Sequence, residues 1–252
     1  MKYFIIFFLV IQFVFGQSKM KPEETEVWEP EPKVVQPGVF LLPPSDAIIL
    51  FDGTDFSKWR SERTQGDVEW TLNPDKSMTV KPGKGGIETI DEHGSVQLHI
   101  EWKSPTVIKG EGQGRGNSGI FFQRRYEIQV LDSYQNRTYS NGQAGSVYKQ
   151  YMPLVNAMRP PGEWQVYDIV FNAPIYDGDG NEIKVGSLIV FHNGVLIQNA
   201  AEIQGTTEYI GEPQKGRDVM PRYLDDNINN RSLLLQDHGD LVSYRNIWVR
   251  KL

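Results

Sequence analysis

The feature that most constrains the fold is a series of short apolar segments, each closed by Gly, Pro, Asn or Asp. None of them keeps the 3.6-residue period of a long helix, and several alternate between apolar and polar residues, as strands do. We predict strands in the ranges 47–51, 68–72, 77–80, 96–102, 119–123, 126–131, 145–148, 164–171, 186–194, 195–200, 232–239 and 244–252.

An Asn-Gly pair, Asn193-Gly194, separates two of these apolar runs and predicts a tight hairpin turn. Many short strands with short connections favour an all-β fold, a two-sheet sandwich or jelly roll. The absence of a fixed-period repeat in the sequence makes a propeller or a β-helix less favoured.

The first residues have the pattern of a secretory signal peptide. Lys2 precedes an apolar run over 3–15, and the small residue Gly16 follows it. The run is shorter than the roughly 20 residues of a comfortable membrane span, so a membrane anchor is the weaker alternative. We predict a signal peptide at 1–16, export to the periplasm or the medium, and no membrane span after its removal.

Proline and glutamate dominate residues 17–45, which we interpret as a linker or arm because repeated prolines prevent regular strand pairing. The compact domain is predicted to occupy 46–252. The chain has no cysteine, so no disulfide supports it, and its formal net charge of -6 argues against general nucleic-acid binding. Nothing in the sequence indicates an oligomeric state.

The strand predicted at 126–131 carries unusual polar groups. Glu127 and Gln129 share one face of this strand, and Ile128 and Val130 share the other. The polar face either points into a cleft or lies in solvent, as it does on many antiparallel strands. Asp132 falls out of phase with this pattern unless the strand ends or bulges before it.

A second polar cluster, Gln236-Asp237-His238-Gly239, follows three leucines near the C-terminus. A histidine at a strand end can reach a cleft and transfer a proton near neutral pH, or it can bond a backbone carbonyl and hold the turn. Asn117 stands among glycines, which let the backbone approach a substrate or a neighbouring strand closely.

Metal signatures are weak in this sequence. Asp177, Asp179 and Asn181 alternate as oxygen ligands do in some calcium loops, but no later glutamate completes an EF-hand. Asp and Gly are also ordinary turn residues, which favours a simple loop. No zinc spacing is present. We assign no metal ligand and no cofactor, and leave open only a divalent cation such as calcium.

Several motifs, taken in order, resemble one family. The run Ile49–Trp59, ILFDGTDFSKW, is similar to the opening motif of the 3-keto-disaccharide hydrolase domain family. GNSGIFFQ followed by YEIQVLDS resembles the central signature of that family, and the ending LLLQDHGDLVSYRNIWVRKL completes the resemblance. The resemblance extends from about Asp46 to Leu252.

The resemblance implies a concanavalin A-like jelly-roll β-sandwich, export from a bacterium, and cleavage of glycosides that are already oxidised at C3 of the sugar. Laminarinase-type glycosidases of similar fold carry further carboxylates on the active strand, but this strand offers Glu127-x-Gln129-x-Leu131. Because a retaining glycosidase needs two carboxyl groups about 5–5.5 Å apart, a conventional endoglucanase is disfavoured.

A 3-keto sugar offers another route, in which a base removes the acidified C2 proton, the C1 oxygen leaves and water adds back. We assign Glu127 and His238 as the proton-transfer pair without choosing which is the base. The predicted substrate-binding residues are Asn117, Arg124, Gln129, Asp132, Tyr148, Gln236 and Asp237. Trp164 is a further candidate for ring stacking. The alternative function is a non-catalytic carbohydrate-binding β-sandwich, since this fold hosts both.

Overall fold

The computed structural model describes residues 21–39, 42–215 and 229–252; the predicted signal peptide lies outside them. The chain divides into two units, Met1–Val35 and Gln36–Leu252. Within its described part, the first unit contains one 3₁₀ helix, η1 (Pro22–Thr25), and no strand. The second unit contains all the strands discussed below.

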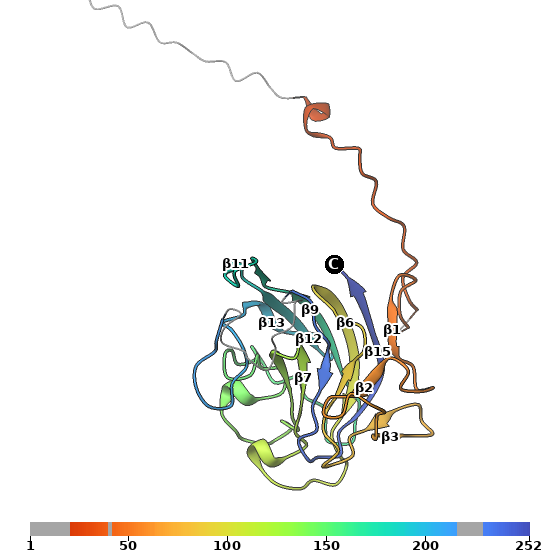
Figure 1. Ribbon diagram of the computed structural model, residues 1–252, viewed down its shortest axis with the longest axis vertical. Helices are drawn as coiled ribbons and strands as arrows, with labels where there is room; N and C mark the ends of the chain where they lie inside the picture. The colour runs from red at the N-terminus through yellow and green to blue at the C-terminus, as the bar shows by residue number, and fades with distance from the viewer. Residues whose placement is uncertain (1–20, 40–41, 216–228) are drawn as a thin grey trace, which may run out of the picture. The chain divides into compact units, whose positions relative to one another are not determined.

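Eight strands form a large antiparallel sheet, in the order β13-β12-β9-β6-β15-β4-β3, with β1 paired to β15. Figure 1 shows β1, β15, β6, β9, β12 and β13 side by side in this sheet. The bounds are β1 (Ile48–Phe51), β3 (Thr71–Leu72), β4 (Met78–Thr79), β6 (Val96–Lys103), β9 (Gln165–Asn172), β12 (Ser187–His192), β13 (Val195–Glu202) and β15 (Ser243–Lys251).

A second antiparallel sheet has five strands in the order β2-β5-β14-β7-β8. Its strands are β2 (Trp59–Ser61), β5 (Ile87–Thr89), β14 (Leu234–Leu235), β7 (Ser118–Phe122) and β8 (Tyr126–Val130). A separate hairpin joins β10 (Ile175–Tyr176) to β11 (Glu182–Lys184), and two further 3₁₀ helices are η2 (Gly112–Gly114) and η3 (Ser140–Gly142). The predicted all-β jelly-roll sandwich is confirmed.

The core lies between the two sheets and follows from strand alternation. Along β9, Tyr167, Ile169 and Phe171 are buried, while the residues between them are half-buried. Ile120 of β7 and Ile128 of β8 meet this layer from the small sheet. Full burial of an aliphatic or aromatic side chain contributes about 1.5–3 kcal/mol to the stability of the fold. The face of each strand that carries the apolar residues therefore turns inward.

Two buried tyrosine hydroxyls join the sheets at β7 and β8. Tyr167 of β9 donates to the backbone oxygen of Gln129 at 3.0 Å. Tyr244 of β15 donates to Ser118 Oγ at 2.7 Å. The strands that carry the predicted polar face are therefore held in place by the large sheet.

The predicted Asn-Gly turn is confirmed, because β12 and β13 pair with His192 opposite Val195 and both turn residues have positive φ. Three predicted strands are wrong or much too long, and one of them is the range 232–239, of which only Leu234–Leu235 is a strand. Residues 145–148 form only two isolated bridges, from Val147 to Ile128 and to Tyr151, since positive φ values at Gly145 and Lys149 bend the chain on either side. Of the range 68–72, only Thr71–Leu72 is a strand.

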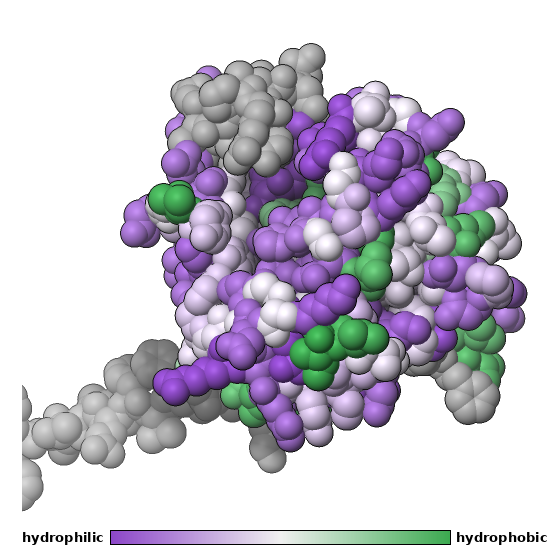
Figure 2. Space-filling model, turned by 90° about the horizontal axis from the view of Figure 1, so that it is seen from below, coloured by the Kyte–Doolittle hydropathy of each residue, from purple (hydrophilic) through white to green (hydrophobic). Residues whose placement is uncertain are grey.

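The face seen in Figure 2 is mainly hydrophilic, with hydrophobic residues in small separate patches. In the described part of the chain, no helix is both long and apolar enough to cross a membrane.

Candidate active site

The β7–β8 hairpin presents a polar outer face. Phe121 pairs with Glu127, and Gly119 pairs with Gln129. The alternative of a solvated face is wrong, because Glu127 is 5% exposed and Gln129 is 1% exposed. Thr207 contributes to this cover, since its hydroxyl accepts a hydrogen bond from the Glu127 backbone nitrogen at 2.9 Å.

A cavity of about 410 Å³ lies over this face. It brings together six of the nine predicted site residues, from strands, loops and the C-terminal region. The lining residues are Asn117, Phe121, Glu127, Gln129, Tyr148, Thr207, Glu208, Tyr209, Ile210, Gln236 and His238. We call this cavity the Glu127 pocket. Glu127 and His238, which are distant in sequence, thus line one space.

Glu127 is a buried carboxyl group of altered acidity. Burial raises the pKa of Glu127 from its ordinary value to about 8, because the charged form loses its hydration. Gly119 makes room for the carboxyl group: a Cβ at that position would lie 2.6 Å from Glu127 Oε1. A carboxyl group with a pKa near neutral can serve as an acid or as a base.

The Gln129 side-chain amide lies against this carboxyl group. With its nitrogen turned toward Glu127, the amide donates to Glu127 Oε1 and to the Ser118 backbone oxygen, both at 2.9 Å. In the opposite orientation the nitrogen donates to Gln113 Oε1 at 2.9 Å. Gln129 is therefore placed to stabilise ionised Glu127.

Tyr148 forms another wall of the Glu127 pocket. Its hydroxyl lies 2.5 Å from the hydroxyl of Tyr139, and its backbone nitrogen donates to the Glu127 backbone oxygen at 3.1 Å. Burial, together with the neighbouring Tyr139, raises the pKa of Tyr148 above its ordinary value. Tyr148 is therefore a neutral hydroxyl donor at physiological pH.

Two amide side chains offer hydrogen bonds to a ligand. Gln236 Oε1 is buried and has no hydrogen-bond partner among the described residues. The nitrogen of the Asn117 amide donates to the Gln113 backbone oxygen at 2.6 Å. An orphaned buried oxygen costs free energy unless a ligand or water satisfies it, so Gln236 suits a sugar hydroxyl.

His238 lies at the exposed rim of the pocket, on a loop that its neighbour Asp237 fixes. Asp237 Oδ2 accepts from the Gly85 nitrogen at 2.9 Å, and Oδ1 accepts from the Gly239 nitrogen at 3.0 Å. Asp237 was predicted to bind substrate, but it does not line the Glu127 pocket. Its carboxylate is occupied by backbone groups that hold the His238 loop.

Arg124 also lies outside the pocket, contrary to prediction. It belongs to the turn between β7 and β8, where its φ is +58°, so strand alternation does not direct its side chain. Its guanidinium pairs with buried Glu88 at 2.9 Å. Trp164 is likewise elsewhere: Lys103 Nζ and Arg245 Cζ lie 4.6 and 4.1 Å from the centre of its ring.

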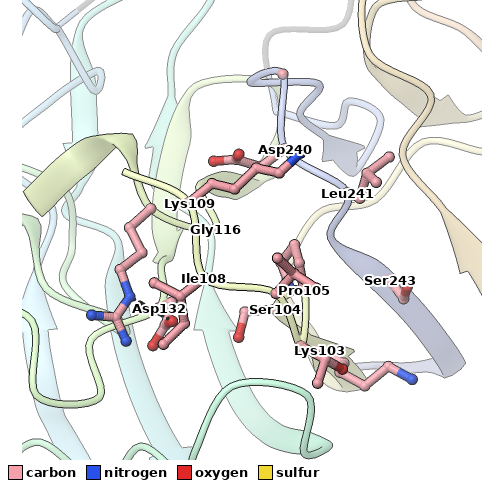
Figure 3. A pocket seen from close by; sticks show the side chains of 14 residues that line it. Lys103, Ser104, Pro105, Ile108, Lys109, Gly116, Asp132, Asp240, Leu241 and Ser243 are labelled. Carbon is pink, nitrogen blue, oxygen red and sulfur yellow. Dashed lines mark hydrogen bonds and ion pairs between the residues drawn. The ribbon is translucent and has the colours of Figure 1, made fainter. Parts of the chain in front are cut away.

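Asp132 lines a different cavity, of about 470 Å³. Figure 3 shows Asp132 beside Ile108 and Ser104, with Ser243 across the space. Its carboxylate accepts from Arg115 Nε at 2.8 Å and from the Tyr134 nitrogen at 3.1 Å. Alternation already sets Asp132 out of phase with Glu127, and the end of β8 at Val130 does not bring it back to the Glu127 pocket.

Sequence reasoning missed the loop that closes the Glu127 pocket, Thr207–Ile210. Glu208 is the second carboxylate of the pocket, and Thr206 Oγ1 donates to it at 2.8 Å. The signal available in the sequence was a glycine-bounded loop with two adjacent bulky residues, Tyr209 and Ile210. Both residues are exposed in the structure. No periodicity marks such a segment.

The sequence left open a site for a divalent cation such as calcium. No group of three or more His, Asp or Glu side chains in residues 21–39, 42–215 and 229–252 is arranged to hold a metal ion. The carboxylate of Asp177 instead accepts hydrogen bonds from the backbone nitrogens of Asp179 and Asn181, at 3.0 and 2.8 Å, within the β10–β11 turn.

Known proteins resemble this chain over most of its length. A 3-keto-disaccharide hydrolase from Bacteroides thetaiotaomicron is 25% identical in an alignment 248 residues long, and the match covers 81% of this chain and 78% of that protein. The crystal structure of a candidate glycosyl hydrolase from Parabacteroides distasonis is 47% identical, with a TM-score of 0.85, and the match covers 94% of this chain and 99% of that one.

A second such structure from Parabacteroides distasonis is 21% identical, with a TM-score of 0.55, over 82% of this chain and 94% of that one, and shares the fold. Residues 46–250 match the family of 3-keto-alpha-glucoside-1,2-lyase-like domains. That match spans most of the sequence, so the chain belongs to the 3-keto-alpha-glucoside-1,2-lyase-like domain family.

Proposed function

We propose that this chain is an exported enzyme that cleaves 3-keto glycosides, 3-keto disaccharides among them, by elimination across C1 and C2 followed by hydration. The observation that carries the proposal is a buried carboxyl group of raised pKa, Glu127, in one pocket with an imidazole, His238. The description of the family and the name of the Bacteroides relative support this substrate class.

The chemistry follows from the ketone. The C3 carbonyl acidifies the hydrogen on C2, and a base removes that proton to leave an enediolate. The electron pair then forms the C1–C2 double bond, and the C1–O bond breaks with release of the protonated leaving group. Water adds across the double bond, returning a proton to C2 and a hydroxyl to C1. The net reaction is hydrolysis.

The geometry favours Glu127 as the base. A carboxylate whose conjugate acid has a pKa of about 8 is a stronger base than an ordinary glutamate. Tyr148 is a neutral donor in the same pocket, suited to the oxygen on which charge develops, while the Gln129 amide stabilises ionised Glu127. We assign His238, the second group of the proton-transfer pair and a lining residue of the same pocket, to protonate the leaving oxygen.

The test compares a 3-keto glucoside with the unoxidised glucoside. Glu127→Gln keeps the shape of the side chain but removes the base, so kcat/KM for the oxidised substrate should fall about 10²–10⁴-fold. The matched control, Glu202→Gln, changes an exposed carboxyl group on β13 and should leave turnover intact.

Because the base must be ionised and the acid protonated, wild-type kcat/KM should follow a bell-shaped pH profile, with a rising limb set by the pKa of Glu127 at about 8. Unchanged turnover in Glu127→Gln would remove Glu127 from the mechanism. Binding of sugar without products in the wild type would select the alternative, a carbohydrate-binding module.

A further inference from the structure

A second cavity, of about 380 Å³, adjoins the Glu127 pocket. Tyr148 and Glu208 line both spaces and form the boundary between them. The cavity is lined by Tyr139, Asn141, Tyr148, Lys149, Gln204 and Glu208, with Gly211, Glu212 and Pro213 at one end. We call it the Tyr139 pocket.

The lining of the Tyr139 pocket is suited to a hydrophilic ring. The side chains of Gln204 and Glu212 make no hydrogen bond to any residue that the structure describes, so they are available to ligand hydroxyls. Tyr139 is 40% exposed, and its ring lines the pocket and offers a surface for the C–H groups of a sugar. Pro213 is the one aliphatic side chain of the lining, so a purely apolar aglycone would leave these polar groups unpaired.

The walls of the Tyr139 pocket are held before any ligand arrives. Tyr139 and Tyr148 share a hydrogen bond of 2.5 Å, and the backbone of Lys149 exchanges hydrogen bonds of 2.8 and 3.1 Å with Asn141. Lys149 Nζ donates to the Tyr209 backbone oxygen and lies 4.7 Å from the centre of the Tyr209 ring. These contacts tie the loop that carries Glu208 to the loop that carries Tyr148.

We propose that the Tyr139 pocket binds the leaving group of the substrate, and that this leaving group is a second sugar ring. The inference rests on the proposed function, because it places the oxidised ring in the Glu127 pocket. Small-molecule sites occupy about 300–1,000 Å³, so each cavity accommodates one ring and the pair a disaccharide. The glycosidic bond then crosses the boundary formed by Tyr148 and Glu208.

The experiment compares a 3-keto disaccharide with methyl 3-keto-glucoside, which lacks the second ring. Glu212→Ala removes an exposed carboxylate of the Tyr139 pocket, and Glu202→Ala is the matched control on β13. Loss of one or two hydrogen bonds should lower kcat/KM for the disaccharide about fivefold to tenfold in Glu212→Ala. Its kcat/KM for the methyl glycoside should not change, and the control should change neither.

A second readout, calorimetric binding of the same two ligands to Glu127→Gln, does not require turnover. Tighter binding of the disaccharide that is lost with Glu212→Ala supports the Tyr139 pocket, even if the wild type cleaves neither ligand and the proposed function fails. Cleavage of both ligands with equal kcat/KM and equal affinity would overturn the second-ring site and leave the proposed function standing. Equal losses for both ligands in Glu212→Ala would also overturn it.

Discussion

Gly119 shows how the absence of one side chain leaves room for a neighbouring buried carboxyl group, that of Glu127. It lies on β7 opposite Gln129, and its backbone oxygen accepts from the Gln236 nitrogen at 3.0 Å. A Cβ at this position would meet Glu127 Oε1 and Phe121 Cε2, each at 2.6 Å. The glycine is required here for space, since its φ is not in the left-handed region.

Gly119→Ala should therefore displace the Glu127 carboxyl group. We expect kcat/KM on a 3-keto glycoside to fall at least about tenfold, with a loss of unfolding free energy of about 1–3 kcal/mol from overpacking. Gly114→Ala is the control, because a Cβ there meets nothing within 4 Å. Steady-state kinetics and urea unfolding measure the two effects. Full activity in Gly119→Ala would show that the position of Glu127 is not critical.

At the scale of elements, a charged network joins three strands of the large sheet. His99 of β6 lies opposite Asp168 of β9, with 2.6 Å between Nδ1 and Oδ1. Glu101 of β6 accepts from Arg245 Nε at 2.7 Å and from Asn246 Nδ2 at 2.9 Å, both on β15. Burial opposes the charge on His99, but the hydrogen bond to Asp168 and the carboxylate of Glu101, 3.9 Å from Nε2, prevail and raise its pKa to about 9.

This network predicts a loss of stability in alkali. The pKa of His99 is higher in the folded state than the value of about 6.5 for an unfolded chain, so folding is favoured below that value. The stabilisation is lost as pH rises through about 9. Thermal unfolding from pH 6 to pH 10 should show a smaller fall in Tm for His99→Gln than for the wild type.

The comparison with the variant is needed because Glu127, whose pKa is also raised, lowers wild-type stability over the same pH range. Glu127 is unchanged in His99→Gln, so its effect cancels in the difference. Identical pH slopes for wild type and variant would show that His99 is not charged in the folded protein.

At the scale of the whole molecule, the chain consists of a sandwich unit and a separate N-terminal unit. The described residues from Glu23 to Val34 are all exposed. The sandwich begins with an anchor of its own: Arg250 donates to both oxygens of Asp46, each at 2.8 Å.

A variant lacking residues 17–35 should therefore fold as the full chain does, with Tm within about 2 °C and unchanged turnover, because the described residues from Glu23 to Val34 are exposed. Asp46→Ala should lower Tm, since Arg250 loses a bidentate partner. Differential scanning calorimetry of both variants tests this expectation. A large loss of Tm on deletion would mean that the arm contributes to the core.

Much of the fold was predictable because strand alternation and turn chemistry are local. The phase of Glu127 and Gln129 against Ile128 and Val130 follows from alternation along β8. The Asn193-Gly194 turn follows from the tolerance of both residues for positive φ. At Arg124, in the turn after β7, alternation does not apply, and Asp132 lines another cavity because it stays out of phase with Glu127.

The sequence by itself determined that the chain is all-β, which residues share the polar face of β8, and where the Asn193-Gly194 hairpin turns. These features depend on neighbours along the backbone. Only the tertiary structure decided which polar groups share the Glu127 pocket, and it added Glu208 from a loop without periodicity. It also decided the acidity of Glu127, since desolvation arises from residues that are distant in sequence and close in space.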